Sequence, residues 1–361
     1  MTNQTGRATI EMQRAWLEKA SGRRCSRRRM LGLAAAAPWL VGSPLLAQEN
    51  HSRTRHAIDF PPVPPNKKSL ARVERVNHLA AECVRLDNEA RDAFAQSHPG
   101  VQPELKLRLP KSTINAFDWC NLNKVSEAHR QRTGDCWANS ATEALECGFL
   151  IRDKLQVVLS TQPVLDHLKL HAKAISGSAT MAFDYFLRIG TALLQHYPYD
   201  GKPKEPLSVK LPYRAVAWGY VSQTEQPPTI AELKHALLTH GPLAVSVLST
   251  PAFHKYRGGL FHEAGVQPHE VHGFSNHVVL LTGWDDTRGQ HGAWKIKNSW
   301  GEGWGEQGFM WIRYASNFIC HNSQWVRAMS RYYPVPAGIH QLIPDARPWP
   351  HVKTEQRAAA P

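Results

Sequence analysis

The sequence predicts an α+β protein with one packed domain between about Leu109 and Tyr333. In the first half of this domain, apolar residues recur at helical spacing over residues 136–150, 162–174 and 181–189. In the second half, short apolar runs bounded by glycine or proline predict strands at residues 243–248, 277–283, 294–297 and 309–312. Helices that precede antiparallel strands are typical of an α+β domain, here with two sub-lobes.

The first 47 residues have the pattern of an export signal rather than of a folded element. A long polar stretch ends in Arg27, Arg28 and Arg29, and an alanine-rich apolar run follows from Leu31 to Ala47. This arrangement is typical of a twin-arginine signal peptide. Proline interrupts the run twice, which favours a cleaved signal over an uncleaved membrane anchor. We therefore expect export from a bacterial cell to the periplasm or the exterior, with cleavage after Ala47.

The net charge of +13 does not indicate a nucleic-acid-binding protein. Residues 1–47 hold eight Lys or Arg against two Glu, which accounts for +6 and leaves +7 on the remaining chain. No dense basic run with interleaved aromatic residues follows, so the excess is interpreted as solvated surface. No later segment is apolar and long enough to cross a bilayer, and we expect no membrane contact once the signal is removed.

Two segments flank the packed domain. Residues 48–108 begin with a proline-rich linker and continue as an amphipathic helix from Ser69 to Phe94, which Pro99 and Gly100 end. The apolar stripe of this helix is too weak to support it alone, so we expect the helix to lie against another part of the chain. Residues 334–361 are rich in proline, and we expect an extended or disordered tail there.

Cys136 stands where a helix would activate a nucleophile. The segment Gln131-Arg-Thr-Gly-Asp-Cys136-Trp137 leads directly into the helical pattern of residues 136–150. A helix N-terminus carries about half a positive charge, which stabilises a thiolate. By itself, this pattern is as typical of a buried structural cysteine beside a tryptophan.

Two later segments supply partners for a cysteine nucleophile. His277 begins an apolar strand, and Asn298 ends a later one. A glycine- and tryptophan-rich turn that contains Trp300 follows Asn298. A histidine on an apolar strand is more often a core residue than a catalytic one, so it is the combination with Cys136 that indicates a catalytic site.

Together the three segments resemble the active-site segments of the papain family of cysteine peptidases, in the same chain order. The resemblance extends to residues 159–166, 197–199, 241–245 and 256–261, and covers about residues 117–333. It implies a two-lobed papain-like fold, with a helical left lobe, an antiparallel β-barrel-like right lobe and the active-site cleft between them. It also implies a monomer that hydrolyses peptide or protein substrates without a cofactor or a metal ion.

The resemblance also implies a role for each residue. Cys136 and His277 would form a thiolate–imidazolium pair, with the histidine as general base and acid. Asn298 would orient the imidazole, and Trp300 would shield their hydrogen bond from solvent. The oxyanion would be bound by the backbone N–H of Cys136 and by the side-chain amide of Gln131. The residues implied in substrate binding are Gly177, Ser178, Thr180, Ser246, Val278 and Trp300.

Three positions depart from the family pattern. Gln131 lies five residues before Cys136, where the family usually has six, and Arg130 stands at the ungapped position. Asp135 directly precedes the nucleophile, where it could cap the helix, but its charge should slightly oppose thiolate formation. Thr133 replaces a residue that is commonly a half-cystine in the family.

The cysteine count fits an exported protein with one free thiol. Five cysteines remain after the signal, at positions 83, 120, 136, 147 and 320. The resemblance implies that the segments of Cys120 and Cys147 lie together, so a Cys120–Cys147 disulfide is our preferred pairing. Cys320 resembles a family half-cystine but lacks the matching partner, and Cys83 is either its mate or free.

Two questions stay open from the sequence. Residues 48–108 stand where the family carries an inhibitory propeptide, yet the propeptide signature is not matched, so a permanent helical extension fits nearly as well. The departures at Asp135 and Gln131 allow a catalytically inactive papain-fold binding protein. A further alternative keeps the Cys–His pair but uses it as an acyl transferase or amidase.

Overall fold

The structure is a computed structural model that describes residues 67–101, 113–169, 172, 174–224, 226–268 and 274–343. The expected export signal, the proline-rich linker and the tail after residue 343 lie outside the described residues. The described residues belong to one compact unit. No helix within these ranges is both long and apolar enough to cross a membrane.

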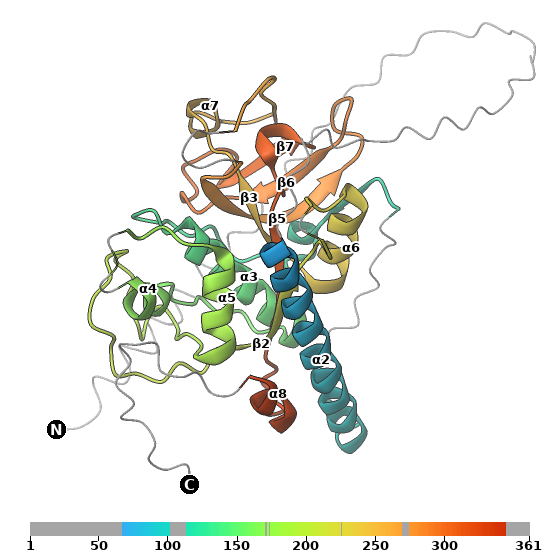
Figure 1. The fold of residues 1–361 in the computed structure, drawn as a ribbon, viewed down its shortest axis with the longest axis vertical. Coiled ribbons are helices and arrows are strands. Elements are labelled where there is room, and N and C mark those ends of the chain that lie inside the picture. Colours follow the sequence, from blue (N-terminus) through green and yellow to red (C-terminus); the bar gives the residue numbers. More distant parts are fainter. Residues whose placement is uncertain are drawn as a thin grey trace, which may run out of the picture. The chain divides into compact units, whose positions relative to one another are not determined.

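Three helices build the first part of the domain (Figure 1). They are α3 (Cys136–Asp153), α4 (Gln162–Lys169) and α5 (Ala179–Arg188). α3 is buried on nearly every side, as expected of a helix in the middle of a core, and α5 packs against it. The helical pattern predicted the starts of all three within two residues, but α4 ends at Lys169, well before the predicted residue 174.

The second part of the domain is one sheet with the strand order β2-β8-β3-β5-β6-β7-β4. Its main strands are β2 (Ala215–Tyr220), β3 (Leu243–Val247), β5 (His277–Asp285), β6 (Ala293–Lys297), β7 (Phe309–Arg313) and β8 (Ser323–Ala328). Two short strands join it: β1 (Ala116–Asp118) pairs with β5, and β4 (Leu260–Phe261) pairs with β7 in parallel. The other named strand pairs are antiparallel. The predicted α+β class is confirmed.

The sheet stays open among the described strands, whereas we expected a barrel-like closure. Its path ends at β2 on one side and at β4 on the other. The physical reason at the β2 end is that a helix, α2 (Lys67–Ser97), lies along this strand in place of another strand.

The order of the strands determines which site residues become neighbours. β5 lies between β3 and β6. His277 is the first residue of β5 and Asn298 directly follows β6, so the two come from adjacent strands. α3 packs against β5, and the hydroxyl of Ser140 donates to the carbonyl of Val278 at 2.9 Å. The start of α3 is thereby joined to the start of β5.

Shorter helices complete the domain. α6 (Ile230–His240) begins with a capping box, in which the hydroxyl of Thr229 accepts from the N–H of Glu232 and the carboxylate of Glu232 accepts from the N–H of Thr229. The other short elements are α7 (Pro251–His254) and two 3-10 helices, η1 (Trp119–Leu122), which precedes α3, and η2 (Ser316–Phe318).

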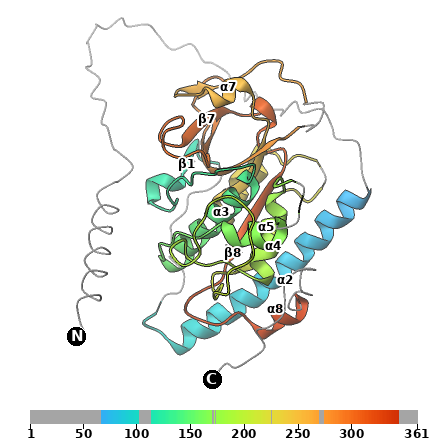
Figure 2. The same cartoon turned by 90° about the vertical axis from the view of Figure 1, so that its left-hand side faces the viewer.

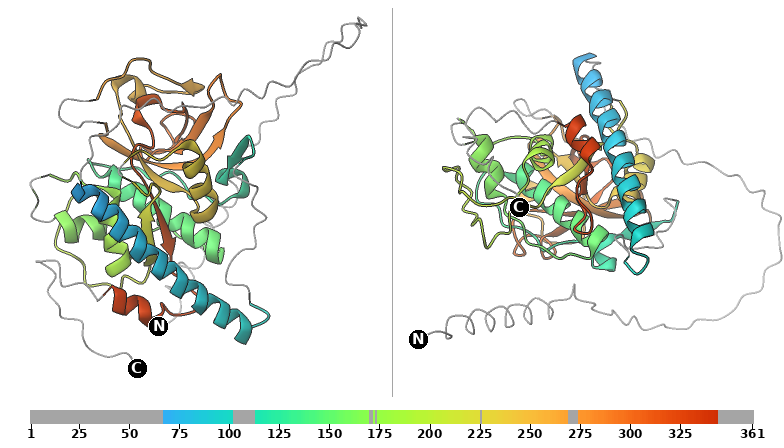
Figure 3. Two further views of the ribbon diagram at one scale, coloured as in Figure 1. Left: turned by 45° about the vertical axis from the view of Figure 1, so that its right-hand side comes forward. Right: turned by 90° about the horizontal axis from the view of Figure 1, so that it is seen from below.

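α2 is the longest helix in the described part of the chain, and it contains the predicted span from Ser69 to Phe94. Figures 2 and 3 show it running across the outside of the domain, with α8 (Ala337–Leu342) beside it. Asn77 bonds to the chain at the end of β2: its amide donates to the carbonyl of Ser222 at 3.1 Å, and its Oδ1 accepts from the N–H of Tyr220 at 2.8 Å. The expectation that this helix lies against another part of the chain is confirmed.

The expected extended tail after Pro334 is wrong in its first part. Residues 337–342 form α8, which packs against α2 and buries Ile339. A Cβ on Gly338 would come within 3.0 Å of the side chain of Leu86 on α2. Proline does not prevent this helix, because Pro336 stands at its N-cap, where no intrahelical N–H donor is required.

The structure does not contain the Cys120–Cys147 disulfide that we preferred. All five cysteines between positions 83 and 320 are buried as separate thiols. Burial raises the pKa of Cys83 and of Cys147 to about 11, so both are neutral at physiological pH. Buried thiols of this kind pack as small apolar side chains.

Candidate active site

Cys136 is the first residue of α3, and its side chain is 9% exposed. The backbone N–H groups of Val278, of Trp137 and of Cys136 itself act to lower the pKa of its sulfur. The first N–H groups of a helix have no acceptor within the helix, so they are available to an anion at this point. The predicted position of Cys136 at a helix start is confirmed.

His277 is hydrogen-bonded to Asn298. The Nε2 of the ring lies 2.8 Å from the Oδ1 of Asn298, and the same oxygen accepts from the backbone N–H of Ser299 at 2.9 Å. A carboxamide oxygen only accepts, so Nε2 carries a proton and a neutral ring has Nδ1 as its basic nitrogen. Asn298 is fully buried, which keeps this hydrogen bond away from bulk water.

One residue, Val278, connects the helix of Cys136 with the strand of His277. Val278, whose backbone N–H acts to lower the pKa of Cys136, is the neighbour of His277 in β5, and its carbonyl accepts from Ser140 on α3 at 2.9 Å. The structure therefore gathers the helix start, the strand start and the carboxamide of Asn298 in one cluster.

Aromatic rings cover the hydrogen bond between His277 and Asn298. Trp300 stacks on His277 with ring centroids 4.9 Å apart, and Phe253 meets the same imidazole edge-on at 6.2 Å. His254 stacks on Trp300, with ring centroids 4.5 Å apart. His254 was not among the predicted site residues. These rings reduce the access of water, so the hydrogen bond lies in a low-dielectric setting.

Burial dominates the protonation of both titratable groups. It raises the pKa of the Cys136 thiol to about 11; backbone donors oppose this rise, and the charge of Asp135 adds to it. It lowers the pKa of His277 to about 4, although the hydrogen bond to Asn298 acts in the opposite direction. A single charge on either group is therefore unfavourable at neutral pH, and a charged state requires both groups to ionise together.

Asp135 occupies the N-cap of α3 without capping it. Its side chain is buried and makes no capping hydrogen bond; its Oδ2 instead accepts from the hydroxyl of Tyr199 at 2.7 Å. Tyr199 in turn accepts from the backbone N–H of Arg132 at 2.9 Å, which holds it at the loop before the nucleophile. Burial raises the pKa of Asp135 above its ordinary value. Of the two interpretations of Asp135, capping is wrong.

Removing the charge of Asp135 should make Cys136 more reactive. In Asp135→Asn the amide oxygen can still accept from Tyr199, but no negative charge opposes the thiolate. We expect the midpoint of Cys136 alkylation to fall by about one pH unit, measured as the rate of iodoacetamide labelling against pH. Asp184→Asn, which removes a carboxylate that pairs with Arg188 on α5, is the control and should leave the midpoint unchanged. An unchanged midpoint in Asp135→Asn would show that Asp135 exerts no charge on the thiol.

Gln131 is held by three hydrogen bonds. Its backbone N–H donates to the carbonyl of Ser299 at 2.7 Å, and its Oε1 accepts from the hydroxyl of Ser299 at 2.6 Å. Its side-chain amide donates to the carbonyl of Thr133 at 2.7 Å, so one of its two amide N–H groups is used within the loop. Arg130, the alternative from the ungapped comparison, is exposed and forms an isolated bridge with Trp300.

Gly177 and Ser178 lie in a segment that is fastened to Trp137. The indole N–H of Trp137 donates to the carbonyl of residue 175 at 2.9 Å, and a Cβ on Gly177 would come within 2.6 Å of the indole ring. Glycine is therefore required at this position. Ser178 has extended backbone angles, and its hydroxyl lies 2.7 Å from that of Thr180, which is buried.

Ser246 and Val278 lie opposite each other in the pairing of β3 with β5. The hydroxyl of Ser246 accepts from the backbone N–H of Asn322 at 2.9 Å and is buried. Val278 is half-buried, and its backbone N–H acts to lower the pKa of Cys136. Of this pair, Val278 is thus the residue that is hydrogen-bonded to the helix of the candidate nucleophile.

A buried lysine fixes the end of the strand that precedes Asn298. The Nζ of Lys297 donates to the carbonyls of Ser126 and Glu127 at 2.9 and 3.0 Å and lies 3.4 Å from the carboxylate of Glu143 on α3. Lys297 is fully buried. Lys297 was not among the predicted site residues, although a lysine inside an apolar strand next to a candidate site residue is a detectable signal.

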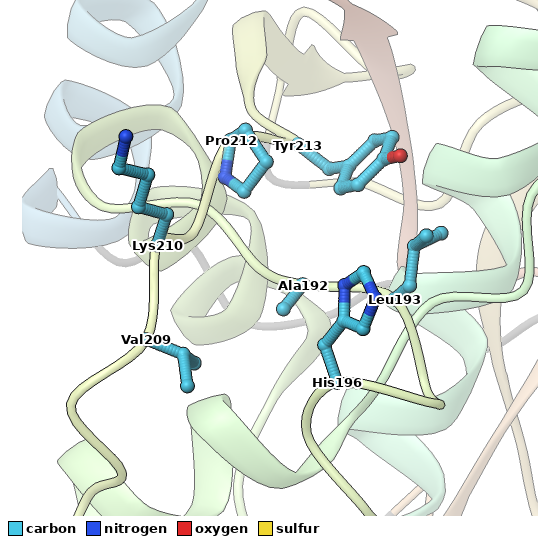
Figure 4. A pocket seen from close by; sticks show the side chains of 7 residues that line it. All are labelled: Ala192, Leu193, His196, Val209, Lys210, Pro212 and Tyr213. Atoms are coloured by element: carbon cyan, nitrogen blue, oxygen red, sulfur yellow. The ribbon is translucent and has the colours of Figure 1, made fainter. Parts of the chain in front are cut away.

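A hollow of about 550 Å³ is lined by residues other than those above (Figure 4). Its lining consists of Ala192, Leu193, His196, Val209, Lys210, Pro212 and Tyr213. Figure 4 shows that the ammonium group of Lys210 and the ring of His196 do not point toward a common position. We therefore assign no ligand to it.

Fold and site together define a class of protein. Residues 113–330, more than half of the chain, match the domain described as papain family cysteine protease. The chain therefore belongs to the papain family of cysteine proteases, which are hydrolases that cleave peptide bonds in peptides or proteins.

Individual relatives agree with this assignment. The chain is 29% identical to cathepsin O of Homo sapiens over 235 residues, which cover 62% of this chain and 68% of the relative. It is 32% identical to cathepsin J of Rattus norvegicus over 235 residues, which cover 63% and 67% of the two chains. Among solved structures, the bromelain protease of Ananas comosus in complex with the E64 inhibitor matches with a TM-score of 0.51 and 23% identity, over 59% of this chain and 99% of bromelain. This last likeness shows the shared fold.

Proposed function

We propose that this protein is an exported cysteine peptidase in which Cys136 is the nucleophile, His277 the general base and acid, and Asn298 the residue that orients the imidazole. The observation that carries the proposal is the hydrogen bond of 2.8 Å between His277 and Asn298, beside Val278, whose carbonyl accepts from Ser140 in the helix that Cys136 opens. Membership of the papain family supplies the reaction class.

Proton transfer from the sulfur of Cys136 to Nδ1 of His277 generates the nucleophile. The transfer creates a thiolate and an imidazolium together, so each charge compensates the other in the buried site. The N–H groups of Val278 and Trp137 support the thiolate, and the oxygen of Asn298 supports the imidazolium. Because the two charges form together, their attraction offsets the free-energy cost of burying each charge.

The thiolate attacks the scissile carbonyl and forms a tetrahedral oxyanion. The donors that we assign to this oxyanion are the backbone N–H of Cys136 and the second amide N–H of Gln131, whose first N–H is bound to Thr133. His277 then protonates the leaving amine, which departs and leaves an acyl-enzyme. The same histidine activates the water that releases the acyl group.

The substrate is proposed to lie along residues 177–178, where the extended backbone of Ser178 offers hydrogen-bonding groups to a peptide. The side-chain pocket is assigned to Thr180, Ser246 and Val278, because Val278 is hydrogen-bonded to Ser140 in the helix that the nucleophile opens. Trp300, stacked on the imidazole, is assigned to the side of the leaving group.

Labelling of Cys136 tests the proposal. At pH 5 to 6, iodoacetamide is expected to react with Cys136 about a hundredfold faster than with free cysteine, because only a thiolate reacts and free cysteine is almost fully protonated there. Mass spectrometry locates the label, and Cys136→Ser should remain unlabelled under the same conditions. Cleavage of a peptide library by the wild type, with Cys136→Ser in parallel, then measures hydrolysis itself.

One observation favours a second candidate, a papain-fold binding protein without catalysis. Burial and the charge of Asp135 both raise the pKa of Cys136. If the sulfur stays a thiol, labelling will be no faster than that of free cysteine and the peptide library will stay intact. That pair of results would replace the peptidase proposal with this candidate.

The exported location rests on the sequence of the first 47 residues, in which Arg27 and Arg28 precede the apolar run. Changing both arginines to lysine is expected to retain the protein in the cytoplasm. Cell fractionation of a bacterial host measures this, and unchanged export would contradict the twin-arginine route.

A further inference from the structure

We propose that α2 is a permanent part of the active enzyme and that its Arg72 is a specificity-determining residue, which favours substrates with a carboxylate side chain in the pocket lined by Thr180. The inference rests on the proposed function, because it assigns a substrate class to the same site. Two observations carry it: the buried charge cluster that holds α2, and the contact between Arg72 and Thr180.

Asp87 of α2 is the centre of the buried charge cluster and is 0% exposed. Its Oδ2 accepts from Nη1 of Arg152 at 2.9 Å and from Nε of Arg327 at 2.6 Å. The hydroxyl of Tyr333 donates to its Oδ1 at 3.2 Å and accepts from Arg152 at 2.7 Å. These partners belong to α3, to β8 and to the segment before α8. A single carboxylate thus joins α2 to three parts of the domain.

Apolar packing holds α2 along much of its length. Val73, Ala80 and Cys83 recur at helical spacing and are each at most 8% exposed. Between them, Asn77 is hydrogen-bonded to backbone groups at the end of β2. A helix buried in this way is stabilised mainly by its tertiary contacts, so it forms one folding unit with the sheet.

A propeptide that is removed on activation must leave without uncovering buried charge. If α2 departed, the buried Arg152 and the partly buried Arg327 would both lose this carboxylate, which is unfavourable. The end of β2 would also lose the hydrogen bonds of Asn77. α2 is therefore part of the mature enzyme and not a removable inhibitor.

Arg72 lies near the N-terminal end of α2, at the substrate segment. Its Nη2 is 3.4 Å from Oγ1 of Thr180, and that oxygen is 2.7 Å from the hydroxyl of Ser178. Gly177, the preceding residue, packs directly on the ring of Trp137, the residue that follows the nucleophile. A short series of contacts thus connects the Arg72 guanidinium with the candidate active site.

The chemistry of Arg72 favours a carboxylate partner. A guanidinium has five N–H donors in a planar fork and stays charged at any working pH. Its described neighbours, Thr180 and Tyr220, are both neutral at pH 7, since burial raises the pKa of the tyrosine even though Arg72 opposes that rise. A substrate glutamate or aspartate that reaches Thr180 would meet the fork in charge-assisted hydrogen bonds.

Peptides that differ in one side chain test the specificity. We would measure kcat/KM of the signal-free chain on matched peptides with Glu, Gln or Lys at the pocket position, which library cleavage identifies. The wild type is expected to prefer Glu over Gln by about five- to tenfold. Arg72→Gln should remove this preference, and Arg72→Glu should turn it toward Lys.

Arg75→Gln is the matched control, because Arg75 is an exposed arginine one turn further along the same helix. It should leave the Glu-to-Gln ratio unchanged. A wild-type ratio in both Arg72 variants, with normal hydrolysis of the Gln peptide, would overturn the role of Arg72 and leave the proposed function intact. Failure of the wild type to cleave any peptide would instead overturn the proposed function.

The mass of the labelled enzyme tests the retention of α2. Active protein is labelled at Cys136 and separated under denaturing conditions, and its intact mass is measured. We expect one labelled chain that still includes residues 67–97. A fully active labelled chain that begins after residue 101 would show that α2 is a propeptide.

Discussion

Replacing His277 with alanine is expected to lower kcat about ten-thousandfold, because the thiol of Cys136 loses the base that accepts its proton. Burial raises the pKa of this thiol to about 11, so without an imidazolium partner only about one molecule in ten thousand would carry a thiolate at pH 7. Steady-state hydrolysis of a peptide found by library cleavage measures the effect.

Three further variants test the same assignment of roles. Cys136→Ala should lose as much activity as His277→Ala, and the double variant no more, because the two groups act as one unit. Asn298→Ala keeps the base and loses only its orientation, so we expect a smaller loss, roughly ten- to hundredfold. A His277→Ala enzyme that keeps more than about one hundredth of the wild-type kcat, with unchanged thermal unfolding, would contradict the assigned role.

Replacing Asp87 with alanine is expected to lower the free energy of unfolding by about 3–5 kcal/mol, because the buried guanidinium of Arg152 and the partly buried one of Arg327 lose their shared carboxylate. Urea denaturation measures the change. Asp92→Ala is the matched control, since Asp92 is an exposed carboxylate on the same helix that pairs with Arg91; it should change the free energy by about 0.5 kcal/mol or less. A loss below about 1 kcal/mol in Asp87→Ala would show that the cluster does not hold α2 in place.

The pH dependence of stability gives a second readout of Asp87. Burial alone would raise its pKa, but the charges of Arg152 and Arg327 and their hydrogen bonds outweigh burial and hold the pKa below the ordinary value of 3.8. A carboxylate with a lowered pKa stabilises the folded state above its ordinary pKa, and this contribution is lost as the pH falls through the lowered value. The stability difference between wild type and Asp87→Ala should therefore be constant above about pH 5 and shrink below about pH 4.

The sequence predicted those site residues that stand at the start or end of an element. Cys136 opens a helix, His277 opens a strand and Asn298 follows one, and apolar periodicity marks each of these boundaries. Their roles in catalysis stay predictions. Asp135 was harder to interpret, because a local pattern suggests a helix cap, whereas the hydroxyl of Tyr199, 64 residues away in sequence, binds the carboxylate.

Contacts between distant segments could not be predicted from local pattern. Asp87 lies 65 residues from Arg152 and 240 residues from Arg327, and periodicity does not indicate which charges pair. The Cys120–Cys147 disulfide was an expectation from proximity of segments, but the two thiols are buried without being joined. Proximity does not suffice for a disulfide, which also requires a specific geometry.

Some elements were hidden by their composition. The strand at 215–220 is a continuous apolar run, which periodicity does not distinguish from a short buried helix. The strand at 323–328 contains Gln324 and Arg327, and so lacks an apolar pattern. α8 is enclosed by prolines, which are typical of irregular chain, although proline only excludes a helix interior.

The docking of α2 and α8 has a practical meaning for recombinant work. A fragment trimmed to residues 113–330 would retain Cys136, His277 and Asn298 but would lack both helices. The outer side of β2 would then be uncovered, and a bare strand at the margin of a sheet is a template for pairing between molecules. Expression of residues 67–343 should yield soluble protein, whereas the shorter fragment is expected to aggregate.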